Sequence, residues 1–376
     1  MFVLLGMGTS RLTLDLAVQG GGSRGVALNA AVAEMLRRGH TIRRLVGTSA
    51  GAITAALVAA GFSGDELVQM SVSRTDGWSL LSECVTEPIV PMSPDAEPII
   101  SEAQLTALKL PGELGRRLLS AHAALAFLDR GGFVSGEGFV GWLMRVLEGK
   151  QRGLSHVTLG ELHARTGRHL TVIVSDTTAR RMRALNHVSA PDCPLVSAVR
   201  MSMSMPLFFT EVVWRAEWGS YAGEDVTGHV MVDGGVLSNL PIGFIMPSAN
   251  AVVERLMGPP PAGVAVPVGL VLDATLEVPG APLAPGASST LGAFFATRLG
   301  QRIRALVDTL LNGMDLTLSD TASLHLCRLP AKGYGATEFD MSLPRVEALV
   351  AAATDATAKY FDELEASRHR VAISSS

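Results

Sequence analysis

The N-terminal part of the chain contains two successive strand-to-helix units, and this pattern strongly limits the folds that the chain can adopt. Residues 12–18 alternate apolar and polar side chains as a strand does, and a glycine-rich run at 20–25 ends the alternation. An amphipathic helix is expected from Val26. A second strand, 42–46, leads into another glycine run and a helix of small residues. This order predicts a parallel sheet that is covered by helices.

The alternation of strands and helices resumes after an irregular segment, 65–130, which carries several prolines and is expected to be a lid or an insertion. The other expected elements are a helix at 138–147, strands at 170–174, 212–218, 229–232 and 268–272, and helices at 291–311 and 344–364. No internal repeat or linker separates them, so we expect one domain, 12–364, and a polar C-terminal tail, 365–376. The expected fold class is α/β, with three α/β/α layers and a mostly parallel central sheet.

Composition and charge exclude several classes of protein. Apolar residues make up 48% of the chain, which is enough for a deep core. The 31 Lys and Arg residues against 35 Asp and Glu give a formal net charge of -4, and no basic run is present, so we expect no nucleic-acid partner. The histidines, cysteines and carboxylates lack zinc-site or calcium-loop spacing. We therefore expect no metal and no cofactor.

Two uncharged stretches of 20 residues, 45–64 and 278–297, need to be considered as membrane spans. Glycine and hydroxyl residues interrupt the first and prolines interrupt the second, so neither reads as a continuous apolar helix. The short apolar N-terminus lacks the basic region of a signal peptide. Three scattered cysteines suit a reducing compartment, and we expect a cytoplasmic protein.

The first motif that carries chemistry is a glycine-rich loop between a predicted strand and a predicted helix. It consists of Gly20, Gly21, Gly22, Ser23, Arg24 and Gly25. Its glycines let backbone N–H groups approach a ligand oxygen, and the following helix N-terminus attracts negative charge. The loop also satisfies the Gly-x-Gly-x-x-Gly dinucleotide fingerprint, but the next strand does not end in the acidic residue that binds a ribose. A nucleotide-dependent oxidoreductase is therefore disfavoured, and a plain tight turn remains an alternative interpretation.

The second motif is a Gly-x-Ser-x-Gly sequence between a predicted strand and a predicted helix. Its residues are Gly47, Thr48, Ser49, Ala50 and Gly51. In such a turn the backbone of the serine is strained, its hydroxyl projects above the sheet, and small flanking residues let the strand and the helix approach closely. This placement makes Ser49 a candidate nucleophile, while a structural turn with an idle serine is the alternative.

The third motif is Asp233-Gly234-Gly235, which follows an apolar strand. An aspartate at a strand end is often only a turn former that accepts hydrogen bonds from nearby N–H groups. The order of the three motifs is more informative than the Asp-Gly-Gly motif alone. Along the chain, a glycine loop comes first, a serine turn follows, and a carboxylate at the end of a strand comes much later.

With these three motifs in this order, the sequence resembles the patatin-like phospholipases, a family of lipid acyl hydrolases, as a bacterial-type patatin domain. Further similar pieces lie at 131–139, 199–208 and 333–340. The resemblance extends from about residue 12 to about residue 364 and is weakest in the expected lid. It implies a patatin-like α/β/α fold.

The resemblance also implies roles for the motif residues. Ser49 would be the nucleophile and Asp233 its base in a Ser–Asp dyad, and the loop 20–25 would form the oxyanion hole. Arg24 would steady this loop or bind a lipid phosphate. The implied activity is that of a serine hydrolase of the phospholipase A or lysophospholipase kind, which cleaves carboxylic esters of phospholipids or related acyl lipids. It would need no cofactor, and it would contact a membrane surface transiently.

A serine hydroxyl is a weak nucleophile and needs a base within hydrogen-bond reach. Asp233 would be ionised from mild acid upward at the ordinary aspartate pKa of about 3.9, although burial would raise that value. Two other functions remain open. One is an α/β-hydrolase-type esterase with a triad of Ser49, Asp233 and either His325 or His369. The other is a non-catalytic lipid-binding module, which would have no need of both the serine and the carboxylate.

Overall fold

The computed structural model describes residues 11–73, 131–132, 135–246, 251–282, 325–339 and 341–374, with three short pieces between 301 and 309. In this part of the chain, a sheet of eight strands has the order β5-β6-β3-β2-β1-β7-β8, and β4 pairs with β3 off this path. The strands are β1 (Thr13–Val18), β2 (Thr41–Thr48), β3 (His169–Asp176), β4 (Arg181–Asn186), β5 (Val212–Val213), β6 (Val230–Asp233), β7 (Val266–Asp273) and β8 (Leu326–Pro330).

The sheet is mixed but mostly parallel, as the sequence predicts. β1, β2, β3, β7 and β8 run parallel to their neighbours in this group, and β4, β5 and β6 pair antiparallel. The helices are α1 (Gly25–Arg37), α2 (Ala50–Ala59), α3 (Gly64–Val72), α7 (Glu137–Lys150), α8 (Leu159–Thr166), α9 (Leu195–Ser202), α10 (Ala251–Met257) and α14 (Leu343–Ser374). Short 3-10 helices are η1 (Gly22–Arg24), η2 (Leu154–His156), η3 (Ala216–Trp218), η4 (Gly234–Val236) and η5 (Ile242–Phe244).

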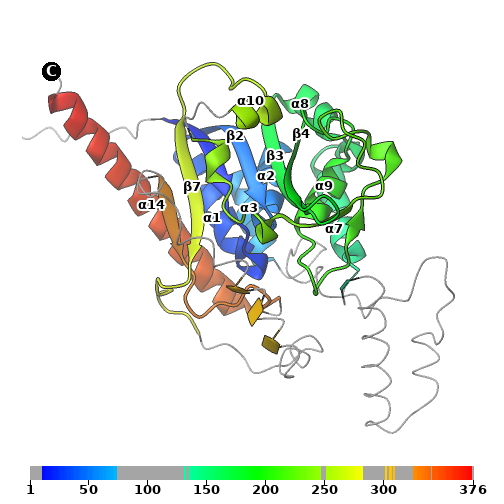
Figure 1. Ribbon diagram of the computed structural model, residues 1–376. Coiled ribbons are helices and arrows are strands. Elements are labelled where there is room, and N and C mark those ends of the chain that lie inside the picture. Colours follow the sequence, from blue (N-terminus) through cyan, green and yellow to red (C-terminus); the bar gives the residue numbers. More distant parts are fainter. Residues whose placement is uncertain are drawn as a thin grey trace, which may run out of the picture.

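Helices flank the sheet because successive side chains of each strand face opposite sides. In β1, Leu14 and Leu16 face a large core that is shared with α1, α2 and α14, whereas Ala17 faces a smaller core with η5 and α10. α14 packs against α1 and β8, and Figure 1 shows α10 at one end of the sheet. Both faces of β1 are therefore buried, as is expected for a parallel strand that helices cover on both sides.

The first residues of the expected lid belong instead to the core. α3 begins with a capping box, in which the Ser63 side chain accepts from the Glu66 N–H and the Glu66 carboxylate accepts from the Ser63 N–H. Leu67 and Met70 on this helix are fully buried in the large core. Residues 74–130, the rest of the expected lid, lie outside the described residues.

The expected strand 212–218 is wrong beyond its first two residues. Only Val212–Val213 forms a strand, β5, and η3 follows at once. The reason is the packing of two tryptophans four residues apart: the rings of Trp214 and Trp218 meet edge to face at 5.8 Å. The Trp214 indole N–H also donates to the Gly219 carbonyl at 2.9 Å. A helical turn allows both contacts, whereas an extended strand would separate the rings.

The C-terminal helix is longer than the sequence indicates. The expected helix 344–364 and most of the expected tail 365–376 form one helix, α14, as far as Ser374. The polar residues of the tail include no proline or glycine that would end a helix. Figure 1 shows the C-terminal end of α14 extending away from the sheet. The expected helix 291–311 lies largely outside the described residues, and no described helix is long and apolar enough to cross a membrane.

Candidate active site

The register of β3 brings the ends of β2 and β6 together. Thr48, the last residue of β2, pairs with Ile173, and Asp233, the last residue of β6, pairs with Val174. β4 pairs with β3 along 171–176, so it occupies the other edge of that strand. β2 and β6 therefore share one edge of β3 and approach each other end to end from opposite directions. Ser49 and Asp233 meet at this junction.

Ser49 occupies the turn between β2 and α2 with φ 53° and ψ −123°, a conformation that is strained for a residue with a Cβ. Its backbone N–H donates to the Ser202 hydroxyl at 2.9 Å, and that hydroxyl donates to the Ile173 carbonyl at 2.6 Å. The neighbouring Thr48 hydroxyl donates to the Ser238 carbonyl at 2.9 Å. These bonds from α9 and from the segment after β6 hold the strained turn in place.

The glycines on either side of Ser49 allow the close approach of the turn. A Cβ atom on Gly47 would lie 2.4 Å from the Gly51 carbonyl oxygen, and one on Gly51 would lie 2.3 Å from the Val18 carbonyl oxygen. Any larger residue at either position would push α2 away from the sheet. The spacing Gly-x-Ser-x-Gly therefore has a packing reason in this chain.

The glycine loop lies directly beside Ser49. A Cβ on Gly20 would lie 3.0 Å from the Ser49 Cβ, and the Gly20 N–H donates to the Asn239 carbonyl at 3.1 Å. Gly22 has φ +57°, the left-handed region that favours glycine. Among the described residues, no hydrogen-bond acceptor contacts the backbone N–H groups of Gly21 and Gly22. Two adjacent donors at the start of α1 are thus available to a ligand.

Arg24 contacts this loop rather than solvent. Its side chain is buried, and its Nε–H donates to the Gly21 carbonyl at 3.2 Å. Ser23 attaches the loop to the segment after β8, because its N–H donates to the Ala336 carbonyl and its hydroxyl donates to the Gly335 carbonyl, both at 2.9 Å. Of the expected roles of Arg24, steadying the loop is the one that these contacts support.

Asp233 is a buried carboxylate beside this turn. Its side chain is 1% exposed, and one oxygen, Oδ1, accepts from the Gly235 N–H at 2.7 Å. Burial raises the pKa of Asp233 to about 7, although the Ser49 hydroxyl and the Gly235 N–H favour its charged form. The other oxygen, Oδ2, is buried and makes no hydrogen bond of standard geometry with the described residues. Burial therefore moves the ionisation of Asp233 from mild acid toward neutral pH, which is the direction that the sequence analysis allows for.

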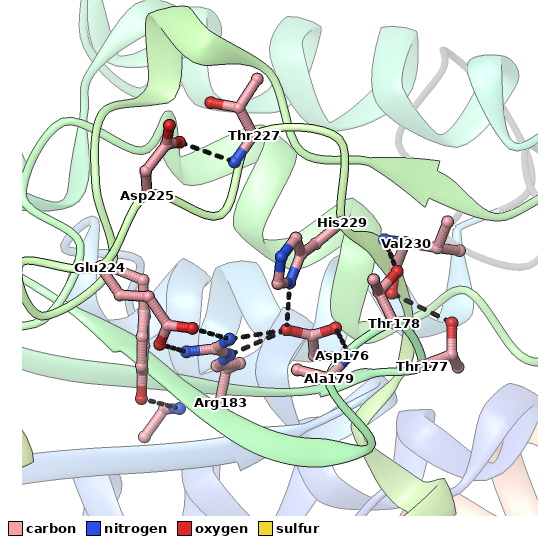
Figure 2. A network of polar contacts seen from close by, with 12 residues as sticks. Asp176, Thr177, Thr178, Ala179, Arg183, Glu224, Asp225, Thr227, His229 and Val230 are labelled. Atoms are coloured by element: carbon pink, nitrogen blue, oxygen red, sulfur yellow. Dashed lines mark hydrogen bonds and ion pairs between the residues drawn. The ribbon is translucent and has the colours of Figure 1, made fainter.

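A charged network holds the strand that carries Asp233. At the end of β3, Asp176 is fully buried and accepts from the Arg183 guanidinium of β4 at 2.8 Å. It also contacts the His229 ring, just before β6, at 2.9 Å, and Arg183 reaches Glu224 at 2.6 Å. Figure 2 shows Arg183 and His229 both at the Asp176 carboxylate, with Glu224 on the other side of Arg183. The network joins β3 and β4 to the start of β6.

The structure separates the histidine of the competing triad from this site. His325 immediately precedes β8, and its carbonyl accepts from the Gly269 N–H of β7. β8 and β7 run parallel to β1 and β2, so His325 lies at the edge where these strands begin, whereas Ser49 lies where they end. Among the described histidines, none hydrogen-bonds to Ser49 or Asp233. The His369 side chain lies outside the described residues.

Sequence reasoning identified the residues of the three motifs but missed several that support them. Ser202 lies within the similar piece 199–208, which was the only signal for it. Asp176 ends an apolar strand in the same way as Asp233, and this is the pattern that points to it. Arg183 lies on β4, a strand of mixed charged and apolar residues, and the local periodicity of this segment did not predict a strand.

The sequence is similar to known proteins. A family model described as patatin-like phospholipase matches residues 16–245. The uncharacterized protein YqhO of Bacillus subtilis (strain 168) is 29% identical over 235 residues, and the match spans 61% of this chain and 65% of that protein.

The chain is also similar to two solved structures. VipD from Legionella pneumophila shows 14% identity and a TM-score of 0.45 over 94% of this chain and 67% of its own. The type III effector ExoU, which is from Pseudomonas aeruginosa, shows 14% identity and a TM-score of 0.42 over 94% of this chain and 54% of its own.

The raised pKa of Asp233 predicts a stability effect that needs no assay of activity. The folded chain binds a proton that the unfolded chain releases between about pH 4 and pH 7, so the buried carboxyl costs stability as the pH rises through this window. Asp233→Asn removes the ionisation. The free energy of unfolding of Asp233→Asn minus that of the parent should therefore be larger at pH 8 than at pH 4.5, by up to about 4 kcal/mol.

Urea denaturation at the two pH values measures this difference. The exposed Asp192→Asn is the matched control and should show no such change. An equal difference between Asp233→Asn and the parent at both pH values would contradict the raised pKa.

Proposed function

The chain belongs to the patatin-like phospholipase family, and from this premise we propose that it hydrolyses carboxylic esters of phospholipids or related acyl lipids, with Ser49 as nucleophile and Asp233 as base. The observation that carries the proposal is the junction of β2 and β6 on β3, which sets a strained serine beside a buried carboxylate of raised pKa. A binding module has no evident need of this pairing. Contact with a membrane surface and a cytoplasmic location are further parts of the proposal.

In the first step, the Ser49 hydroxyl attacks the ester carbonyl and its proton passes to Asp233. A base is most effective when its pKa lies near the working pH, and the pKa of about 7 makes Asp233 a much stronger base than an exposed aspartate. The tetrahedral intermediate then collapses, the bond to the alcohol breaks, and Asp233 returns the proton to the leaving alcohol. A water molecule, deprotonated in turn by Asp233, attacks the acyl-serine. The bond to the Ser49 oxygen breaks, Asp233 returns the proton to that oxygen, and the fatty acid is freed.

The negative oxygen of the intermediate would bind the N–H groups of Gly21 and Gly22. Both are unoccupied donors in the loop whose first glycine, Gly20, lies beside Ser49, and they stand at the start of α1, where the helix dipole also favours negative charge. Loss of one such donor in other hydrolases costs about 2.7–4 kcal/mol of barrier. Ser23, Arg24 and Gly25 would then support the loop rather than donate to the substrate.

The nucleophile is tested by Ser49→Ala. Its rate of ester hydrolysis should fall by at least about a thousandfold, because the acyl-enzyme can no longer form. The melting temperature should barely change, since alanine can keep the backbone bond to Ser202. A fluorophosphonate probe should label the parent at Ser49 and leave the variant unlabelled.

Ser220→Ala changes an exposed serine and serves as the control, for which parental activity and labelling are expected. Activity of Ser49→Ala within tenfold of the parent would disprove the nucleophile, and absence of labelling in the parent would favour the binding module.

The base is tested by the pH profile. Only ionised Asp233 can accept the proton, so kcat/KM for a water-soluble ester should rise about tenfold per pH unit in acid and level off above about pH 7. Asp233→Asn should lose nearly as much activity as Ser49→Ala, because the two groups act as a unit. His325→Ala should retain the parental rate and profile. A parental profile that is flat from pH 5 to pH 8, or an active Asp233→Asn, would show that another group is the base.

Chelation gives an independent test of the mechanism. None of the proposed groups acts as a metal ligand, so EDTA should leave the rate of ester hydrolysis unchanged. A loss of activity that only added Ca²⁺ restores would indicate a metal-dependent phospholipase mechanism instead.

A further inference from the structure

Three histidines that are distant in sequence come together at the end of β3 opposite to Ser49. His163 lies on α8, His169 is the first residue of β3, and His187 follows the last residue of β4. One ring nitrogen from each lies within 4.8 Å of the other two. The spacing of these residues matches no zinc-site pattern, because the cluster depends on the pairing of β3 with β4 and on the packing of α8 against them.

The rings are close to the arrangement of three ligands around one ion. Ring centroids lie 4.6 Å apart for His163 and His169 and 5.0 Å apart for His169 and His187. His163 and His187 stack at 3.7 Å. Ligand nitrogens at about 2.0–2.1 Å from a tetrahedral ion lie about 3.4 Å from one another. To bind an ion, the three nitrogens must therefore move slightly closer together, and the stacked rings of His163 and His187 must tilt apart.

Hydrogen bonding leaves ring nitrogens available for an ion. The Nδ1 of His163 contacts the Arg168 carbonyl at 3.0 Å, which makes Nδ1 the protonated nitrogen and leaves Nε2 with a lone pair. Backbone carbonyls hold the histidine ligands of metal sites in this way. The Nδ1 of His187 is buried and has no hydrogen-bond partner among the described residues. An unsatisfied buried nitrogen is costly, and a bound ion at the cluster is one way to draw this ring into a satisfied arrangement.

Hydrogen bonds hold the backbone on both sides of the cluster. α8 begins with a capping box, in which the Thr158 side chain accepts from the Glu161 N–H and the Glu161 carboxylate accepts from the Thr158 N–H. After β4, the Asn186 side-chain oxygen accepts from the N–H groups of Val188 and Ser189 at 2.8 and 2.9 Å. These contacts fix the turn that carries His187. All three histidines are half-buried, so the cluster is reachable from solvent.

The charged residues next to the cluster influence which group would occupy a fourth coordination position. Arg44 pairs with His169 across the strands, and both Arg43 and Arg44 bind the Asp15 carboxylate at 2.6 Å. Two cations thus face one anion, so the local charge opposes a bound cation, and an anionic fourth ligand such as hydroxide would offset this cost.

We propose that His163, His169 and His187 form a binding site for one first-row transition metal ion of the Zn²⁺ class, with a fourth position for water or hydroxide. Neutral imidazoles are ligands that these ions prefer. The site is separate from the proposed hydrolase site. Ile173, which pairs with Thr48 beside Ser49, is four residues after His169 on β3, about 13 Å along an extended strand. A bound ion would connect α8, β3 and the end of β4.

The test is calorimetric titration of the tag-free full chain with Zn²⁺ after chelator treatment and dialysis. One ion per chain is expected. His163→Gln and His187→Gln should each weaken binding by about tenfold or more, since each removes one ligand. His156→Gln replaces an exposed histidine outside the cluster and should bind as the parent does. Ser49→Ala should also bind normally, which separates this site from the hydrolase.

Co²⁺ provides a second measurement, because a tetrahedral site with nitrogen ligands gives visible absorption bands. The bands should appear in the parent and His156→Gln and disappear in the two cluster variants. Circular dichroism shows whether each variant is folded, and His163→Gln changes a half-exposed helix residue, so it keeps the test valid if His187→Gln unfolds. Failure of the parent to bind Zn²⁺, or parental binding by folded His163→Gln, would overturn the proposal.

Discussion

The pairing of β3 is the constraint on which the rest of the structure depends. β4 occupies one edge of this strand along 171–176, so β2 and β6 must share the other edge. The shared edge brings the end of a parallel strand against the end of an antiparallel one. The turn that carries Ser49 follows the first, and Asp233 ends the second. Slippage of either strand by one residue would break this contact and turn every side chain of that strand to the opposite face.

Burial of Asp233 has two consequences that oppose each other. A carboxylate away from water destabilises the fold when it is ionised, and no described cation is among the causes of its pKa shift. The same burial raises its affinity for a proton, which is the property that a base for Ser49 requires. The strained backbone of Ser49 likewise costs stability and is held by Ser202 and by contacts of Gly47 and Gly51. Functional sites commonly retain such unfavourable features.

Local patterns were sufficient for the elements and motifs that depend on neighbours in sequence. β1, α1, β2 and α2 were predictable from periodicity and glycine positions, and Ser49 and Asp233 were identifiable from their motifs. Features that depend on distant contacts were not predictable. The shared edge of β3 requires knowledge of three pairings, β5 ends early because Trp214 packs on Trp218, and the histidine cluster forms only when α8 meets β3 and β4.

The two ends of β3 show one physical cause with opposite signs. Loss of water disfavours the charged form of any group, so burial raises the pKa of Asp233 to about 7 and lowers that of His187 to about 4. Burial therefore favours proton binding by Asp233 near neutral pH at one end of β3 and the uncharged form of the His187 ring at the other. The same strand thus carries the carboxyl group proposed as the base for Ser49 at one end and the histidines proposed as metal ligands at the other.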